Sequence, residues 1–265
     1  MPYTECMSWA IRRRILYLIG VFLFFAIVIG GPIAYMLLTV PPTCTDGIQN
    51  QGETAVDRGG PCPLLDPQQL QPSAVLWSRA FSVRDGSYNA TSYIENPNDG
   101  AGVSSVNYIF KLYDSDNVLV AERSGSTFIM PGRITPVFEG TIDTGNRTVA
   151  RSFFALTSEP AWQQMRDPGK AIAVSDISAS DITKTPRVTA NVRNIDVSPL
   201  FDISFVATIF DRTGNAYASS ATHLDRLAAG ETQQIVFTWP DPFTNVIGRI
   251  DVIPRIAPVS TATAR

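Results

Sequence analysis

The chain has 265 residues, a formal net charge of −3 and 45% hydrophobic residues. Lys and Arg are scattered among Asp and Glu and form no basic stripe, so nothing in the sequence favours binding to a nucleic-acid backbone. The length leaves room for a membrane segment followed by one or two domains.

A long uncharged run, Ile15–Leu38, follows a short N-terminal segment, residues 1–14. As a helix it would cover roughly 36 Å, which is enough to cross a hydrocarbon layer of ~30 Å. Arg12 to Arg14 precede the run, and the first charge after it is Asp46. The positive-inside bias therefore predicts an uncleaved signal anchor in the cytoplasmic membrane, with the N-terminus inside and the bulk of the chain outside. A cleaved signal peptide is the alternative, but its apolar core is usually shorter, about 7–15 residues.

The next segment, residues 39–73, is a polar linker with two cysteines, Cys44 and Cys62. An oxidising exterior favours a disulfide between them, whereas Cys6, on the cytoplasmic side, is expected to stay a free thiol. The side chains between the cysteines carry many oxygens, which are the ligands that calcium prefers, and glycines there allow tight turns. The predicted calcium ligands are Asp46, Asn50, Glu53 and Asp57.

A polar spacer without metal is the alternative for this loop. The stretch resembles a short cysteine motif of secreted and surface proteins, C-x-D-G-x-x-N-x-x-E-x-x-x-D-C-G-G-x-C. Arg58 stands where that motif has a cysteine, which leaves the pairing of Cys44 and Cys62 open.

Beyond Ser73, apolar and polar residues alternate, which is typical of antiparallel strands with one buried face. In "VNYIFKLYD" the even-numbered residues from Val106 to Leu112 share the apolar face, and in "ISFVATIFD" the odd-numbered residues from Ile203 to Ile209 do. The strands before them end in Asn96 and Asn194 in the same way. The pattern indicates an internal duplication, and several short strands in each copy favour β-sandwiches.

The predicted boundaries are a first domain at 74–156, a linker at 157–169, a second domain at 170–256 and a flexible tail at 257–265. Trp162, in the linker, is expected either to be an exposed binding residue or to pack as a wedge between the domains.

Phe110–Asp114 reads "FKLYD", the motif that names the FxLYD domains, and the upstream "YIENPN" and the Pro131-Gly132 turn fit the same pattern. The first domain therefore resembles FxLYD domains, which are relatives of the late-embryogenesis-abundant type 2 sandwich. The second resembles them more weakly, because "TIFD" replaces the motif. The resemblance implies an all-β fold, with an N-terminal transmembrane helix before two tandem immunoglobulin-like β-sandwich domains, as in single-span bacterial surface proteins. It implies no catalytic residue.

The usual catalytic constellations are absent: His223 is the single histidine, and G-x-S-x-G, H-E-x-x-H and C-x-x-C do not occur. We expect no catalysis, and His223 is expected to be an exposed strand or turn residue. The predicted function is a membrane-anchored, extracytoplasmic binding or scaffolding module with a protein partner or self-association. A carrier of lipid or another apolar ligand is the alternative, and an enzyme is least favoured. Large residues expected to point inward argue for filled cores: Phe110, Phe138, Phe205 and Phe237.

Overall fold

A computed structural model describes residues 9–39, 44–50 and 52–261. Its contacts divide the chain into two compact units, Met1–Asp46 and Gly47–Arg265. The thiol predicted at Cys6 lies outside the described residues.

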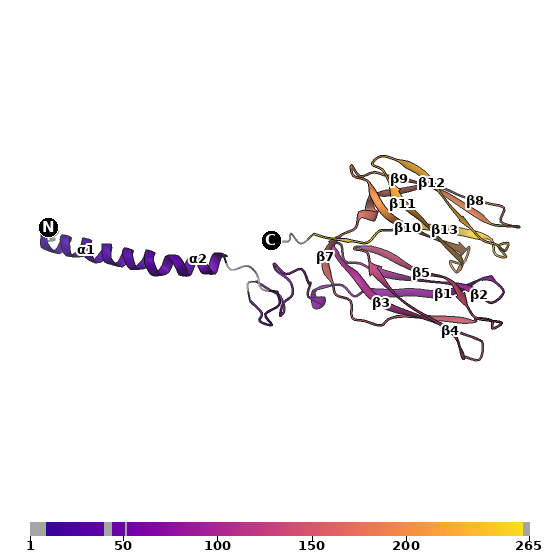
Figure 1. The fold of residues 1–265 in the computed structure, drawn as a ribbon, viewed down its shortest axis with the longest axis horizontal. Helices are drawn as coiled ribbons and strands as arrows, with labels where there is room; N and C mark the ends of the chain where they lie inside the picture. Colours follow the sequence, from indigo (N-terminus) through magenta and orange to yellow (C-terminus); the bar gives the residue numbers. More distant parts are fainter. Residues whose placement is uncertain (1–8, 40–43, 51, 262–265) are drawn as a thin grey trace, which may run out of the picture. The chain divides into compact units, whose positions relative to one another are not determined.

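The first unit contains one long apolar helical segment (Figure 1). An α-helix, α1 (Trp9–Phe25), passes through a π-helical turn, η1 (Ala26–Gly30), into a second α-helix, α2 (Gly31–Thr39). Pro32, just after the π-helical turn, has no N–H to donate and its ring crowds the preceding turn, which explains a local widening at this place. Residues Ile11–Met36 have a mean hydropathy of 2.4, and this apolar segment is not buried against the rest of the protein. The chain therefore has an exposed apolar N-terminal helix that is long enough to cross a membrane, as both signal anchors and signal peptides have.

The second unit is built mostly of β-strands, as the alternating pattern predicts. The strands of its first half are β1 (Ala74–Arg84), β2 (Ser87–Asn96), β3 (Ala101–Tyr113), β4 (Leu119–Ile129), β5 (Arg133–Asp143) and β6 (Arg151–Leu156). Those of its second half are β8 (Ile172–Ser180), β9 (Arg187–Asn194), β10 (Leu200–Asp211), β11 (Ala216–Leu227), β12 (Thr232–Thr238) and β13 (Ile247–Arg255). Two short strands, β7 (Gln163–Arg166) and β14 (Val259–Ser260), and two 3-10 turns, η2 (Pro67–Gln69) and η3 (Pro168–Ala171), complete the fold.

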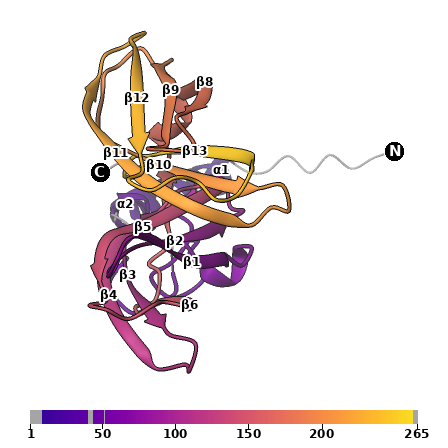
Figure 2. The same ribbon diagram turned by 90° about the vertical axis from the view of Figure 1, so that its right-hand side faces the viewer.

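Each half contains two antiparallel sheets with the same strand order. In the first half β2 lies between β1 and β5, and β3 lies between β4 and β6. In the second half β9 lies between β8 and β12, and β10 lies between β11 and β13. Figures 1 and 2 show the four sheets as successive layers, with the β1-β2-β5 sheet facing the β11-β10-β13 sheet.

Each half buries its own hydrophobic core between its two sheets. Phe110 is fully buried in the first core, and Phe205 and Phe237 are fully buried in the second. Phe138 is the exception to the prediction of inward-pointing phenylalanines. Its neighbour Val137 takes the inward position on β5, so Phe138 points to the opposite face of that sheet and is only half-buried.

The prediction of one buried face holds for β3 and is wrong for β10. On β3 the residues opposite the core, such as Asn107 and Lys111, stay exposed or half-buried. On β10 the opposite residues Val206, Thr208 and Phe210 are buried as well. The reason is that the sheet containing β10 is covered by the first half, so that neither of its faces reaches solvent along this stretch.

The contact between the halves is a small aromatic cluster surrounded by hydrogen bonds. Trp77 and Tyr93 from the first half contact Phe210 from the second, with ring centroids 6.0 and 6.3 Å from that of Phe210. Arg79 Nη1 donates to the carbonyl of Ala216 at 3.1 Å. Because this contact joins the two halves, they belong to one compact unit.

The same polar side chains close equivalent turns in both halves. Asn96 is buried at the end of β2, and its Nδ2 donates to the carbonyls of Ala101 and Met130, the latter just after β4. Asn194 is buried at the end of β9, and its Nδ2 donates to the carbonyls of Ser198 and Leu227, the latter at the end of β11. Asp114 accepts the backbone N–H groups two and four residues later, and Asp211 does the same. The positions that match in the sequence therefore match in their hydrogen bonding.

The predicted linker and part of the predicted tail contribute to the fold. Strand β14 pairs with β7, and β7 pairs with the start of β3, so residues 259–260 are not a loose tail. Trp162 is buried in the core of the first half rather than between the halves or on the surface. Its carbonyl accepts the N–H of Leu65, which fixes the linker against that core.

Candidate functional sites

The loop before the first strand is organised around the buried carboxylate of Glu53. Glu53 Oε2 accepts the backbone N–H groups of Asn50 at 3.3 Å and Asp57 at 3.1 Å. The carboxylate of Asp57 in turn accepts the N–H of Gly47, at 3.1 Å to Oδ2. Three of the predicted calcium ligands, Asn50, Glu53 and Asp57, are thus brought together, but through backbone N–H groups. Asp46, the fourth, precedes Gly47 and belongs to the other unit.

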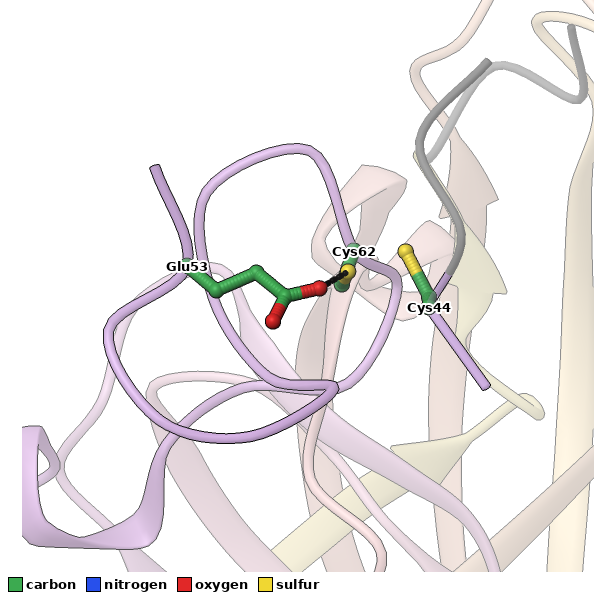
Figure 3. A group of neighbouring side chains, drawn as sticks. All are labelled: Cys44, Glu53 and Cys62. Atoms are coloured by element: carbon green, nitrogen blue, oxygen red, sulfur yellow. Dashed lines mark hydrogen bonds between the residues drawn. The ribbon is translucent and has the colours of Figure 1, made fainter. Parts of the chain in front are cut away.

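Cys44 and Cys62 are both disulfide-bonded. Cys62 is buried, and its Sγ lies 3.0 Å from Oε1 of Glu53 (Figure 3). A disulfide sulfur carries no proton, so this distance describes close packing of the sulfur against the carboxylate and not a hydrogen bond. Gly60 shows why the loop needs glycine here, because it has a φ of 56° and a Cβ would lie 2.5 Å from the carbonyl oxygen of Gly52.

His223, the single histidine, lies on β11 opposite Ser204 of β10. Its side chain is half exposed, and Nε2 is 3.2 Å from Asp225 Oδ1 and 3.7 Å from Asp202 Oδ1. The prediction of an exposed strand residue is confirmed. No serine or cysteine nucleophile is hydrogen-bonded to this imidazole among the residues that the structure describes.

His223 also lines a cavity of about 360 Å³ at the junction of the two halves. Phe138 of β5 forms the wall from the first half, and residues of β10 and β11 form the opposite wall. Arg255, at the end of β13, completes the lining. The outward position of Phe138 therefore places an aromatic side chain in a cavity instead of in a core.

Burial lowers the pKa of the Arg255 guanidinium, because a charged group is poorly solvated there. Nη2 donates to Oγ1 of Thr127 at 2.9 Å, and the guanidinium carbon lies 4.9 Å from the ring centroid of Phe128. Its Nε is buried and has no hydrogen-bond partner among the described residues. Arg255 belongs to none of the sequence motifs described above, although one signal is present, a charged residue within the apolar run "VIPRIA".

A second cavity, of about 400 Å³, lies beside the junction and is lined by β1, by residues 149–152 and by the start of β11. Two arginines border it, and both have partners. Arg79 donates to the carbonyl of Ala216 and to Oδ1 of Asn215, and Arg151 lies over the ring of Tyr113 at 5.1 Å.

No family model matches the chain, and no curated protein sequence matches it. Distant structural matches exist to proteins with β-sandwich domains. A transglutaminase from red sea bream has 7% identity and a TM-score of 0.23, over 71% of this chain and 30% of that one. A putative β-galactosidase from Bacteroides fragilis has 13% identity and a TM-score of 0.20, over 66% and 33%. A β-glucuronidase of glycoside hydrolase family 2 has 11% identity and a TM-score of 0.23, over 82% and 29%.

The chain spans no more than a third of the length of these three proteins. The matches assign no family, and similarity this low carries no argument about activity.

Proposed function

We propose that this protein is a membrane-anchored, extracytoplasmic binding or scaffolding module without catalysis. The observation that carries the proposal is an exposed apolar helix, Ile11–Met36, ahead of a β-sheet unit whose cores are filled by side chains. The helix supplies a tether, and the β unit supplies surfaces for a protein partner or a second copy of the chain.

The charges that flank the helix and the cysteines after it support the proposed location. Arg12 to Arg14 favour a cytoplasmic N-terminus, with the helix kept as a signal anchor in a bacterial cytoplasmic membrane. The disulfide-bonded form of Cys44 and Cys62 suits an oxidising exterior.

An internal duplication of immunoglobulin-like sandwiches is the architecture that we propose for the β unit. The shared strand order of the halves and the equivalent turns closed by Asn96 and Asn194 support it. The "FKLYD" sequence supports a relationship of the first half to FxLYD domains.

Carriage of a lipid between the sheets is the weaker candidate. Such a carrier needs space between its sheets, whereas Phe110, Phe205 and Phe237 fill that space with at most 1% of each residue exposed. Native mass spectrometry of the full chain that finds co-purified lipid would reverse this ranking.

Calcium binding by the loop of Asp46, Asn50, Glu53 and Asp57 stays a proposal within this function. A calcium-dependent rise in the thermal unfolding temperature that disappears in the Asp46→Ala, Asp57→Ala double variant would support it. An unchanged unfolding temperature at millimolar calcium would rule it out.

Cross-linking of the full chain in intact membranes tests the proposed function. We expect a reproducible adduct with a second protein or with another copy of the chain, and we expect the chain to stay in the membrane pellet after carbonate extraction. In a control chain whose residues 1–40 are replaced by a cleavable secretion signal, the β unit should become soluble. A chain that stays monomeric under several cross-linking chemistries would contradict the proposal.

A further inference from the structure

Arg255 is a half-buried cation with one side-chain hydrogen bond to another described residue and one buried donor, Nε, without a partner among them. A guanidinium has five N–H donors, and buried donors are nearly always paired. Here Nη2 has one acceptor, Thr127 Oγ1, and the buried Nε has none. Phe128 offers the face of its ring, which attracts a cation but accepts no conventional hydrogen bond.

Glu139, an acidic side chain of the first half, has other partners. Glu139 Oε1 accepts the hydroxyl of Tyr108 at 2.5 Å, and Oε2 lies 3.9 Å from Nε of Arg123. Within the part of the chain that the structure describes, Arg255 forms no ion pair with any carboxylate. A partly buried charge without a counter-charge is poorly compensated, so a negative group from outside the chain would stabilise it.

The cavity beside Arg255 offers the other contacts that a small organic anion needs. Its lining combines polar groups, from Ser204, Thr222 and His223, with an apolar wall, from Phe138 and Val206. A few convergent polar groups in a mainly apolar cavity of this size are typical of small-molecule sites.

The other cavity, beside the junction, differs in the state of its arginines. There Arg79 already has two protein acceptors and Arg151 is exposed to solvent, so neither arginine needs an outside anion. The two cavities therefore differ in their need for a ligand, although both are bordered by arginine.

We propose that the cavity between the halves binds a small organic carboxylate, with its charge at Arg255 and its apolar body against Phe138 and Val206. Ser204, Thr222 and His223 would hydrogen-bond the polar end or a substituent of the ligand. Asp202 and Asp225 lie beside His223, so the negative charge next to this lining residue disfavours a dianion such as phosphate relative to a monocarboxylate. This inference deepens the proposed binding function and rests on it.

Isothermal titration of the full chain in nanodiscs tests the proposal with benzoate as the probe. Benzamide, which has the same shape without the charge, and inorganic phosphate are the comparison ligands. We expect benzoate to bind at least tenfold more tightly than benzamide and phosphate. Arg255→Gln should weaken benzoate binding at least tenfold, because the charge-assisted hydrogen bonds are lost.

Two further variants keep the test independent of folding. Ala221→Leu fills the cavity from an exposed position on β11 without altering Arg255, and it should also abolish benzoate binding. Arg79→Gln, at the other cavity, removes the same charge and should leave benzoate binding unchanged. Equal binding of benzoate and benzamide, tighter binding of phosphate, or binding that survives Ala221→Leu would overturn the proposal.

The outcome is separable from that of the membrane cross-linking. A cross-linked partner without benzoate binding would remove this ligand site and leave the scaffolding function. Benzoate binding in a chain that never forms an adduct would leave the site and remove the scaffold.

Discussion

Two aspartates hold the turns that follow the central strands of the β unit. Asp114 accepts the N–H groups of Asp116 and Val118 and pairs with Arg147. Asp211 accepts the N–H groups of Thr213 and Asn215 and the hydroxyl of Thr213. A carboxylate that accepts backbone N–H groups is favoured in its charged form, and each of these aspartates is therefore a source of pH dependence.

The pKa of Asp114 lies below its ordinary value because of its hydrogen bonds to Val118, Arg147 and Asp116. The pKa of Asp211 is lowered in the same way by Thr213 and Asn215. A lowered folded-state pKa contributes stability above the unfolded-state pKa of 3.8, and this contribution is lost as the pH falls through the folded-state value.

We therefore expect urea midpoints of the wild-type chain to fall between neutral pH and a pH of about 3. The Asp114→Asn, Asp211→Asn double variant should lose part of this decline, because its amides do not titrate. Asp116→Asn removes a neighbouring charge without altering either acceptor and should keep the wild-type slope. Identical pH profiles for the wild type and the double variant would contradict the assignment.

Strand β8 illustrates a local departure from regular geometry at the element scale. Its pairing with β9 contains one extra residue between Ser175 and Ser178, and Asp176 has a φ of 52°. Asp176 Oδ2 accepts hydrogen bonds from Asn191 Nδ2 at 2.9 Å and Ser175 Oγ at 3.1 Å. Because β8 is an edge strand, this bulge also interrupts the regular ladder that another chain would need for strand addition.

Asp176→Val should lower the free energy of unfolding by about 1–2 kcal/mol, because a β-branched residue is strained in the left-handed region. Asp176→Gly also removes the side-chain hydrogen bonds, but glycine adopts this positive φ without strain. The glycine variant should therefore lower the free energy of unfolding by less than the valine variant. Urea unfolding of the two variants in parallel makes the comparison. Equal losses for valine and glycine would show that the backbone conformation contributes nothing.

Alternation in the sequence predicts strands well and their burial only in part. The even-numbered residues from Val106 to Leu112 and the odd-numbered residues from Ile203 to Ile209 face cores as expected, because a strand repeats every two residues. The burial of the second face of β10, opposite the core, depends on which sheet the first half covers. That contact forms only in the folded protein as a whole. Its only sign in the sequence is the nearly continuous apolar run "FVATIF".

The Glu53 loop and the cavity at Arg255 are less predictable from the sequence than the strands, because their geometry also depends on contacts between distant segments. The polar loop around Glu53 could be located from its residue types, but the carboxylate turned out to accept the loop's own N–H groups. The cavity at Arg255 is lined by strands from both halves, and no local sequence pattern predicts which strands of the two halves come into contact. Trp162 shows the limit most plainly, because its place in the first core depends on the path of the linker.

At the scale of the whole molecule, we expect the aromatic contact between the halves to make them unfold together. Phe210 has 3% of its surface exposed and also carries the guanidinium of Arg249 over its ring, at 4.2 Å. Replacing a buried phenylalanine by alanine typically costs about 3–5 kcal/mol. At this position the loss falls on the junction and not on either core.

Scanning calorimetry of Phe210→Ala should therefore resolve two transitions, one for each half, whereas we expect the wild type to show one transition for the whole β unit. Phe201→Ala, on the same strand with 56% of the residue exposed, should keep the single wild-type transition. A single lowered transition in Phe210→Ala would mean that the remaining hydrogen bonds suffice to couple the halves.

Strand β7 is bordered by both the beginning and the end of the β unit, since Leu64 bridges to Gln163 and Val259 pairs with Arg166. An affinity tag or fluorescent protein attached after the C-terminus would therefore extend from the side of the β unit at which residues 64–65 enter it. The turns at the far side, such as those after Asp114 and Asp211, would stay uncovered and free to meet other molecules.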